Sequence, residues 1–203
     1  MKIAVAIAML ITLAPAALAD TIVADATGKD SSFTTDFWGV EFAAGDALVK
    51  SVTFDLSADW NAYFDFDGSS FNGAKAPVIG ALNGLKTTDI TVKTSGAIRG
   101  FSSHPSLLTF SFAKGSFASG DSFRFSADTD ALGFGVPDPG STIGDSGVMF
   151  NVLFEDGRSF DTVFETQSNQ VATAVVPNPE PGTLVLVLLA FSIFVWRARR
   201  RTA

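Results

Sequence analysis

Residues 148–164 read VMFNVLFEDGRSFDTVF, two runs of alternating apolar and polar side chains on either side of Glu-Asp-Gly at 155–157. An Asp-Gly pair between two alternating runs is the strongest short-range signal for a β-hairpin. A two-residue turn would place apolar side chains opposite polar ones on the same face. A three-residue loop with Gly157 in the left-handed conformation pairs Val152 with Phe160 instead and keeps one face apolar. We therefore expect a hairpin with the three-residue loop.

Similar alternation upstream of this hairpin predicts a domain built of strands. In the run from Leu48 to Leu56, five side chains at every second position share a face, and all but Lys50 are apolar. No stretch between residue 19 and Leu184 shows an apolar period of 3.6 long enough for a helix. We therefore expect an all-β fold, an antiparallel β-sandwich, over about residues 21–164. Further strands are expected at 62–66, 90–94, 107–113 and 122–127, and residues 31–38 are expected to be the first strand or its approach.

Phenylalanine is expected to dominate the core. The chain has 20 phenylalanines, all but Phe191 and Phe194 within the expected domain, and they supply the apolar bulk that is needed by a domain without cysteine, and so without disulfides. Alternation places several of them on shared faces of their strands. The residues expected to be mostly buried are Phe54, Phe110, Phe112, Phe123, Phe125, Phe150, Val152, Phe154 and Phe160.

The first 19 residues have the organisation of a secretory signal peptide. One positive charge at Lys2 precedes a mostly apolar run from Ile3 to Leu13, and Ala17-Leu18-Ala19 has the small-x-small form that signal peptidase cuts. We expect cleavage before Asp20. A retained N-terminal anchor is the alternative, which Pro15 and the alanine-rich close disfavour.

The last 28 residues, 176–203, combine three features in a fixed order. Pro179, Glu180 and Pro181 predict an extended, accessible strip, because proline lacks a backbone donor and restricts its neighbours. The run from Leu184 to Trp196, apolar except for Ser192, can satisfy its backbone in lipid only as a helix. A basic tail, which should stay on the cytoplasmic side, follows this run. Its members are Arg197, Arg199, Arg200 and Arg201.

This arrangement resembles the PEP-CTERM sorting signal of Gram-negative bacteria, whose motif, short helix and Arg-rich tail are recognised together by a membrane enzyme, exosortase. The resemblance implies a precursor held in the inner membrane, cut near 179–182 and transferred to the cell surface or the extracellular space. The chain departs from the family's usual Val-Pro-Glu-Pro by Asn178, which stands before the motif. A permanent anchor is the alternative. The apolar run of 184–196 is about 20 Å of helix, however, which is short for a comfortable span.

These features divide the chain into four segments. Residues 1–19 are the expected signal peptide, and 20–170 the exported β-sandwich domain, whose last strand is expected to end near Phe164. Residues 171–181 are expected to be a linker that carries the Pro-Glu-Pro motif. Residues 182–203 are the expected single C-terminal transmembrane helix with its Arg-rich tail.

The net charge of the exported part limits the kinds of partner that it can bind. The formal net charge is −7, and five of the 14 basic residues lie in the two terminal segments. The exported part therefore has 9 basic against 21 acidic residues, a net charge of −12. Such a charge argues against nucleic acid or an anionic lipid surface as a partner. It suits cation binding or contact with a neutral polysaccharide.

The sequence lacks a catalytic set, so we expect that the protein is not an enzyme. His104 is the only histidine, cysteine is absent, and there is no Gly-x-Ser-x-Gly elbow. With one histidine and no cysteine, the chain also lacks the usual ligands of a zinc site. A carboxylate pair of the glycosidase kind stays open, although few aromatic side chains are available to stack on a sugar. Its candidate members are Asp65, Asp67, Asp128, Asp130 and Glu155.

Two acidic clusters suit calcium, which takes six to eight hard oxygen ligands. One contains Asp65 and Asp67, and the other contains Asp128 and Asp130. In each cluster the acids are two residues apart, so they share a face of a strand or converge in a loop. Neither cluster completes the EF-hand pattern. Calcium is therefore the candidate cofactor, and the alternative is that these acids are solvated turn residues.

These observations lead to two hypotheses for the function. The first is an exported, non-catalytic protein with a structural or adhesive role at the cell surface or in the extracellular matrix. An exosortase-like enzyme is its expected processing partner, and exopolysaccharide is a candidate ligand. The alternative is a calcium-dependent carbohydrate-binding module, with Trp38, Trp60 or Tyr63 as surfaces that stack on sugar rings.

Overall fold

The computed structural model of the chain describes residues 20–29, 31, 34–57, 62–66, 76–96, 105–131, 140–177 and 193. The chain divides into two units, residues 20–178 and a second that joins 1–19 with 179–203. The expected signal peptide, Pro-Glu-Pro motif and basic tail lie outside the described residues, as does the expected membrane helix apart from Ile193. Among the described residues, no helix is long and apolar enough to cross a membrane.

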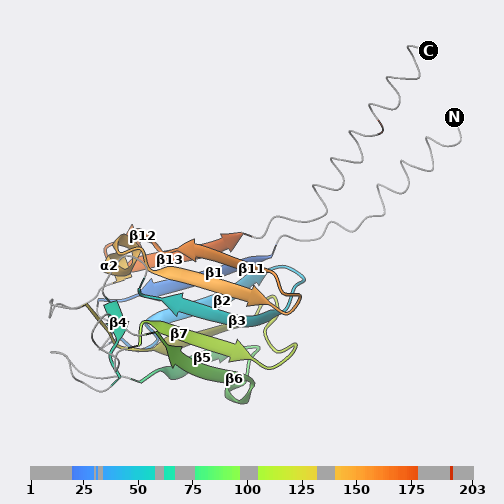
Figure 1. The fold of residues 1–203 in the computed structure, drawn as a ribbon, viewed down its shortest axis with the longest axis horizontal. Helices are drawn as coiled ribbons and strands as arrows, with labels where there is room; N and C mark the ends of the chain where they lie inside the picture. Colours follow the sequence, from blue (N-terminus) through green and yellow to red (C-terminus); the bar gives the residue numbers. More distant parts are fainter. Residues whose placement is uncertain are drawn as a thin grey trace, which may run out of the picture. The chain divides into compact units, whose positions relative to one another are not determined.

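Two antiparallel sheets form most of the described part of residues 20–178 (Figure 1). The larger sheet has the strand order β12-β13-β1-β2-β8-β5, the smaller has β11-β10-β3-β7-β6, and β4 pairs with β9 in a separate ribbon. The expectation of an all-β, antiparallel domain is confirmed. The strands are β1 Thr21–Thr27, β2 Trp38–Ala44, β3 Val49–Asp55, β4 Ala62–Phe64, β5 Val78–Asn83, β6 Ile90–Ser95, β7 Leu107–Phe112, β8 Ser122–Ser126, β9 Thr129–Ala131, β10 Met149–Phe154, β11 Ser159–Val163, β12 Glu165–Ser168 and β13 Val171–Pro177. The short helices are η1 Thr87–Asp89 and α2 Gly140–Asp145.

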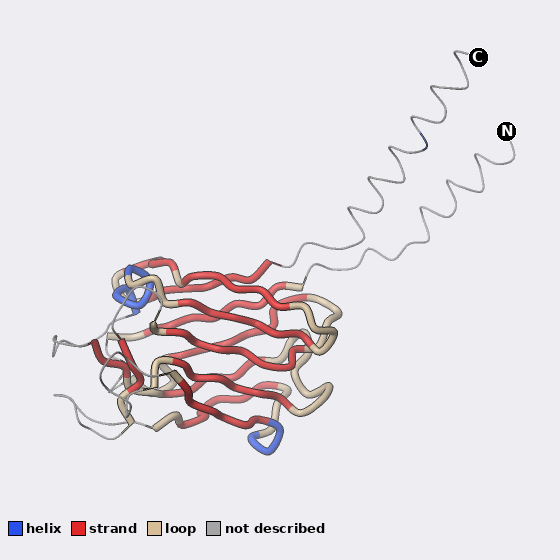
Figure 2. Tube along the Cα trace, viewed as in Figure 1, coloured by secondary structure: helices blue, strands red, loops and turns tan. Residues whose placement is uncertain are grey.

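The two sheets face each other across an aromatic core. In Figure 1 the blue strands β1 and β2 pass behind the teal strand β3, and Figure 2 shows the strands of the nearer sheet running side by side. The ring of Trp38 on β2 lies 5.3 Å from that of Phe54 on β3, and Phe125 on β8 lies 4.5 Å from Phe110 on β7. These contacts join one sheet to the other, an arrangement consistent with the expected β-sandwich.

The expected core residues are confirmed with one qualification. All of them are buried except Phe160, which is partly buried and packs against the core from β11. Several residues that the alternation did not single out are also fully enclosed, among them Trp38, Phe37 and Phe117.

The hairpin at 148–164 forms with the expected loop. Val152 pairs with Phe160, and the amide of Phe164 donates to the carbonyl of Val148. Gly157 has a φ of 90°, the left-handed conformation that a three-residue loop requires. The prediction of the three-residue loop is confirmed.

A β-bulge changes which side chains of β3 face the core. The register between β10 and β3 shifts between Leu153 and Phe154, so that Phe154 pairs with Val49. Val49 is therefore buried and Lys50 is exposed. The expectation that Lys50 shares the inner face with Val52 and Phe54 is wrong, because a bulge inserts one residue and reverses the alternation on one side of it.

The first strand differs from the expectation. It is β1, at Thr21–Thr27, and not residues 31–38; of the described residues in that range only Trp38 lies in a strand, as the first residue of β2. Two of its three buried positions, Ala24 and Ala26, are small alanines, and such a run carries a weak apolar signal.

The prediction of a linker at residues 171–181 is wrong for the first seven of them, which form a strand. The prediction that the domain ends near Phe164 is wrong as well. Residues 171–177 form β13, which pairs along its whole length with β1 and also with β12. Its buried side chains are Ala172, Ala174 and Val176. Small and β-branched residues are compatible with a linker as well as a strand, and the partner β1 lies about 150 residues earlier in the chain.

Asp20 is built into the fold at the point where the domain begins. Its side chain accepts bonds from the backbone amides of 46–47, each at 3.0 Å, and from the Arg158 guanidinium at 3.2 Å. Arg158 also bonds Asp156 at 2.6 Å and lies over the Phe154 ring. The first residue of the domain is thereby joined to the turn of the 148–164 hairpin.

Hydrogen bonding shifts the pKa of both partners in this turn. The backbone amide of Arg158 lowers the pKa of Asp156, with slight burial acting in the opposite direction and the Arg158 side chain assisting. Burial opposes the charge of Arg158, but Asp156 and Asp20 raise its pKa. The lowered pKa of Asp156 adds stability above its ordinary value of 3.8, and this is lost as the pH falls through the folded value. The effect is small because half of the Asp156 side chain is exposed.

Phe54 is the residue whose loss should damage the core most. Its ring contacts aromatic rings from both sheets, those of Trp38, Phe110, Phe125, Phe150 and Phe164. We expect Phe54→Ala to lower the free energy of unfolding by about 3–5 kcal/mol, measured by urea denaturation of the purified protein. Phe160→Ala is the matched control, and its loss should be clearly smaller because Phe160 is only partly buried. Equal losses would contradict a core centred on Phe54.

Candidate metal centre

The short ribbon of β4 and β9 brings together two acidic segments that are far apart in the sequence. Tyr63 on β4 pairs with Asp130 on β9, and the amide of Asp65 donates to the carbonyl of Asp128 at 3.0 Å. Alternation within β9 and the residue before it places Asp128 and Asp130 on the same face of the ribbon. The backbone pairing therefore directs side chains from both segments to one place.

Three carboxylates meet there. One oxygen from each of Asp65, Asp128 and Asp130 lies within 4.8 Å of the others, and all three residues are buried, at 0%, 0% and 7% exposed. The expectation of solvated turn acids is wrong for these three. Asp67, the fourth expected ligand, lies outside the described residues. The two expected clusters thus contribute to one centre.

Buried hydrogen bonds fix the backbone between Asp128 and Asp130. The hydroxyl of Ser31 accepts bonds from the Thr129 amide at 3.2 Å and from the Thr129 hydroxyl at 2.8 Å. The Trp38 indole donates to the carbonyl of Ala127 at 3.4 Å. Ser31 was not expected here from the sequence, because nothing local relates it to a residue 98 positions later.

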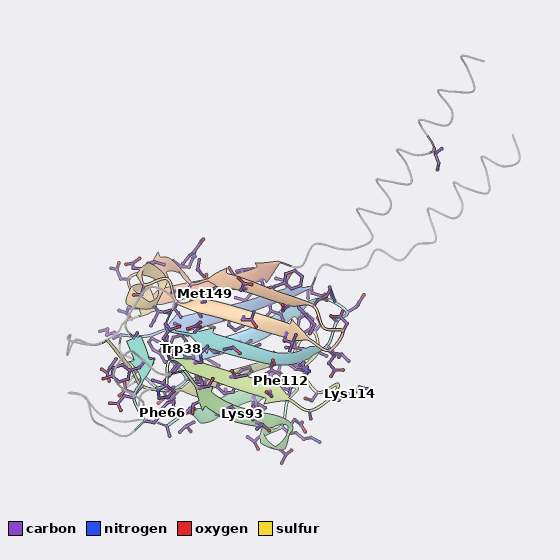
Figure 3. All side chains as sticks on the ribbon, in the orientation of Figure 1. Trp38, Phe66, Lys93, Phe112, Lys114 and Met149 are labelled. Atoms are coloured by element: carbon purple, nitrogen blue, oxygen red, sulfur yellow. The ribbon has the colours of Figure 1, made fainter. Side chains whose placement is uncertain are left out.

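Aromatic side chains pack along the segment that carries Asp65. Phe64 precedes Asp65 and lies between Trp38, whose ring centroid is 6.4 Å away, and Phe66, at 5.9 Å. Figure 3 shows Trp38 and Phe66 at the end of the domain where β4 lies. Such surroundings strengthen the repulsion between close carboxylates, since little water is present to screen it.

The chemistry of the centre favours a hard cation. Calcium lies 2.3–2.6 Å from its oxygen ligands, so two ligands of one ion are at most about 5 Å apart. A limit of 4.8 Å between the three carboxylate oxygens fits this geometry. Among the described residues the cluster consists of carboxylates alone, whereas zinc would prefer histidine or cysteine. Asp65, Asp128 and Asp130 would supply three ligands, and carbonyls or water the remainder.

The other expected site residues lie elsewhere. Glu155 is in the hairpin turn, where it accepts a bond from the amide of Gly115, so it is not part of the acidic centre. Trp38 is fully buried in the core, and Tyr63 is buried. The expectation that Trp38 stacks on a sugar is therefore wrong. Trp60 and His104 lie outside the described residues.

Calcium should raise the melting temperature of the protein if it binds this centre, because a ligand of the folded state alone stabilises that state. At a calcium concentration of 100 times the Kd the gain is about 2.7 kcal/mol. We expect Asp128→Asn to abolish the shift, and Asp65→Asn to do the same if the first variant folds poorly. Asp161→Asn, an exposed acid on β11, should keep it. An unchanged melting temperature in millimolar calcium chloride would remove the calcium assignment.

Comparison with protein-family models, with curated proteins and with solved structures finds no match for the chain.

Proposed function

We propose that the chain is an exported, non-catalytic protein, sorted through its C-terminal segment, with a structural or adhesive role at the cell surface or in the extracellular matrix. In this proposal its domain is a β-sandwich, and residues 182–203 form the transmembrane helix of the precursor. The observation that carries the proposal is the position of the domain boundaries. The compact unit covers 20–178, so it begins at the expected signal-peptide cut and stops directly before Pro179.

The position of Asp20 adds to this support. Its side chain is buried and bonded to residues 46–47 and Arg158. Cleavage before Asp20 keeps these contacts, whereas cleavage a few residues later would remove them. An exosortase-like membrane enzyme would then act on the Pro-Glu-Pro motif just beyond the last strand.

A structural role also agrees with the properties of the acidic centre. In our proposal, calcium bound by Asp65, Asp128 and Asp130 joins β4 to β9 and stiffens this end of the domain. Carboxylates as buried as Asp65 and Asp128 are poorly placed to reach a sugar, which favours a supporting ion over glycosidase chemistry.

The alternative of a calcium-dependent carbohydrate-binding module retains one supporting observation, the acidic centre. It loses Trp38 as a stacking surface, and Tyr63 has little exposed area to offer. We therefore place this alternative second. Binding of a neutral polysaccharide that disappears when calcium is removed with a chelator would reverse the order.

Processing at the C-terminus is the most direct test. We expect mass spectrometry of the surface-located protein to show a chain that begins at Asp20 and ends within 179–182. Glu180→Gln should reduce this processing, because it removes the only charge from the proposed recognition strip. Glu165→Gln, in β12 of the folded domain, is the matched control and should be processed normally.

The basic tail gives a second readout of the same proposal. Neutral residues in place of Arg199, Arg200 and Arg201 should let the tail pass through the membrane before it is recognised. A mature protein that still ends at Ala203 would mean that the segment is a permanent anchor, and the sorting proposal would be wrong.

A further inference from the structure

A cavity of about 270 Å³ lies beside Lys114, which Figure 3 shows toward the end of the sheets away from Phe66. It is lined by Lys50, Phe112, Lys114 and Glu155. Figure 3 shows Phe112 and Lys114 far along the sheets from Phe66. Cavities for drug-sized ligands measure about 300–1,000 Å³, so this one suits a single ring rather than a long ligand.

Three separate parts of the chain hold the lining residues in place. Lys50 follows Val49 at the bulge of β3, which is the reason that its side chain faces outward. Glu155 is bonded through its side chain to the Gly115 amide at 2.6 Å and through its own amide to the Leu48 carbonyl at 2.8 Å. The cavity is thus bounded by the start of β3, the turn after β7 and the turn of the hairpin.

The turn after β7 has a defined conformation that presents Lys114. The amide and the hydroxyl of Ser116 both donate to the carbonyl of Ala113, at 3.0 and 2.7 Å. Gly115 has a φ of 77°, which a side chain would disfavour. This geometry points the Gly115 amide at Glu155 and leaves Lys114 beside the cavity.

The charges of the cavity differ from those of the domain around it. Neither Lys50 nor Lys114 forms a salt bridge with any residue of the described part of the chain. One oxygen of Glu155 is already engaged by the Gly115 amide. The charges of the described lining residues therefore sum to +1, on an exported part whose net charge is −12, so an anionic group is favoured at this place in particular.

Phe112 supplies an apolar wall beside these charges. It lies at the end of β7, 8% exposed, and its ring is held against Phe117, with 4.5 Å between the centroids. Packing fixes the ring, so a ligand meets a rigid apolar surface. The site thus offers two ammonium donors for an anion, a carboxylate acceptor for hydroxyl groups and a phenyl edge for carbon-bound hydrogens.

We propose that this cavity binds one carboxylate-bearing sugar, a uronic acid within an acidic glycan. Lys50 and Lys114 would bind the carboxylate and Glu155 would accept ring hydroxyls, while Phe112, which is largely buried, would offer only its small exposed edge to carbon-bound hydrogens of the ring. A peptide carboxylate shares the first contact only, because it brings neither several hydroxyls nor a ring face. This assignment goes beyond the proposed function, since it holds whether or not the chain is sorted through its C-terminus.

Calorimetric titration of the full chain, purified in a neutral detergent, with a trimer of galacturonic acid tests the proposal. We expect saturable binding that weakens as salt is added. Lys50→Gln and Lys114→Gln should each weaken it about tenfold, the typical effect of losing one charged hydrogen bond. Glu155→Gln should weaken it less, because the amide still bonds hydroxyl groups.

The matched control is Lys93→Gln, an exposed lysine on β6 that does not line the cavity. It should bind the trimer as tightly as the unchanged protein does. If Lys93→Gln weakened binding as much as the two cavity variants do, the trimer would be attracted by lysines in general, and the assignment of the site to this cavity would be overturned. If a neutral glucose trimer bound equally well, the proposed role of the carboxylate would be overturned. If a glutamate-containing tripeptide bound equally well, the assignment of the ligand as a sugar would be overturned. No heat at tens of millimolar would overturn the proposal as a whole, provided that the melting temperature shows a folded protein.

Discussion

The contact between Trp38 and Phe54 is the interaction on which the rest of the domain depends. These rings meet where the two sheets face each other; Trp38 also touches Phe125 of its own sheet, and Phe54 touches further rings of both sheets. A chain without cysteine has no covalent crosslinks to replace this packing. Aromatic rings suit the task, because each buries a large area with few rotatable bonds and adds edge-to-face attraction to its neighbours.

Both candidate sites arise where regular pairing of the sheets stops. The acidic centre needs the short ribbon of β4 and β9, which belongs to neither large sheet. The cavity needs the bulge at Val49 and Lys50, without which Lys50 would be directed toward the core. In each case the aromatic core fixes the strands, and an irregular segment at the strand ends presents the charged groups. This division follows from the cost of burying charge, which keeps ionisable side chains at the ends and faces of the sheets unless a partner is at hand.

The parts of the fold that could be predicted from the sequence are the local ones. The hairpin at 148–164 was predictable because its strands, its turn and its register lie within 17 consecutive residues. The pairing of β1 with β13 was not, because both strands bury mainly alanine and each resembles a linker without its partner. The acids could be named as candidate ligands from their spacing, but the meeting of Asp65 with Asp128 depends on a pairing across more than 60 residues. Trp38 was misassigned because composition does not distinguish a buried tryptophan from an exposed one.

The two candidate sites have opposite charge, and Figure 3 shows Lys114 toward the end of the sheets away from Phe66. The elements that hold the acidic centre, β4 and β9, are distinct from those that line the cavity, which are β3, β7 and the hairpin turn. Direct electrostatic influence of one site on the other is weakened at physiological salt, because Lys50 and Lys114 are exposed and the field of an exposed charge is screened within about 8 Å. Phe64, next to the acidic centre, contacts Trp38, which contacts Phe54 and so the core beneath β3 and β7. The aromatic core is therefore a continuous packed connection between the segment that holds the acidic centre and the strands that line the cavity.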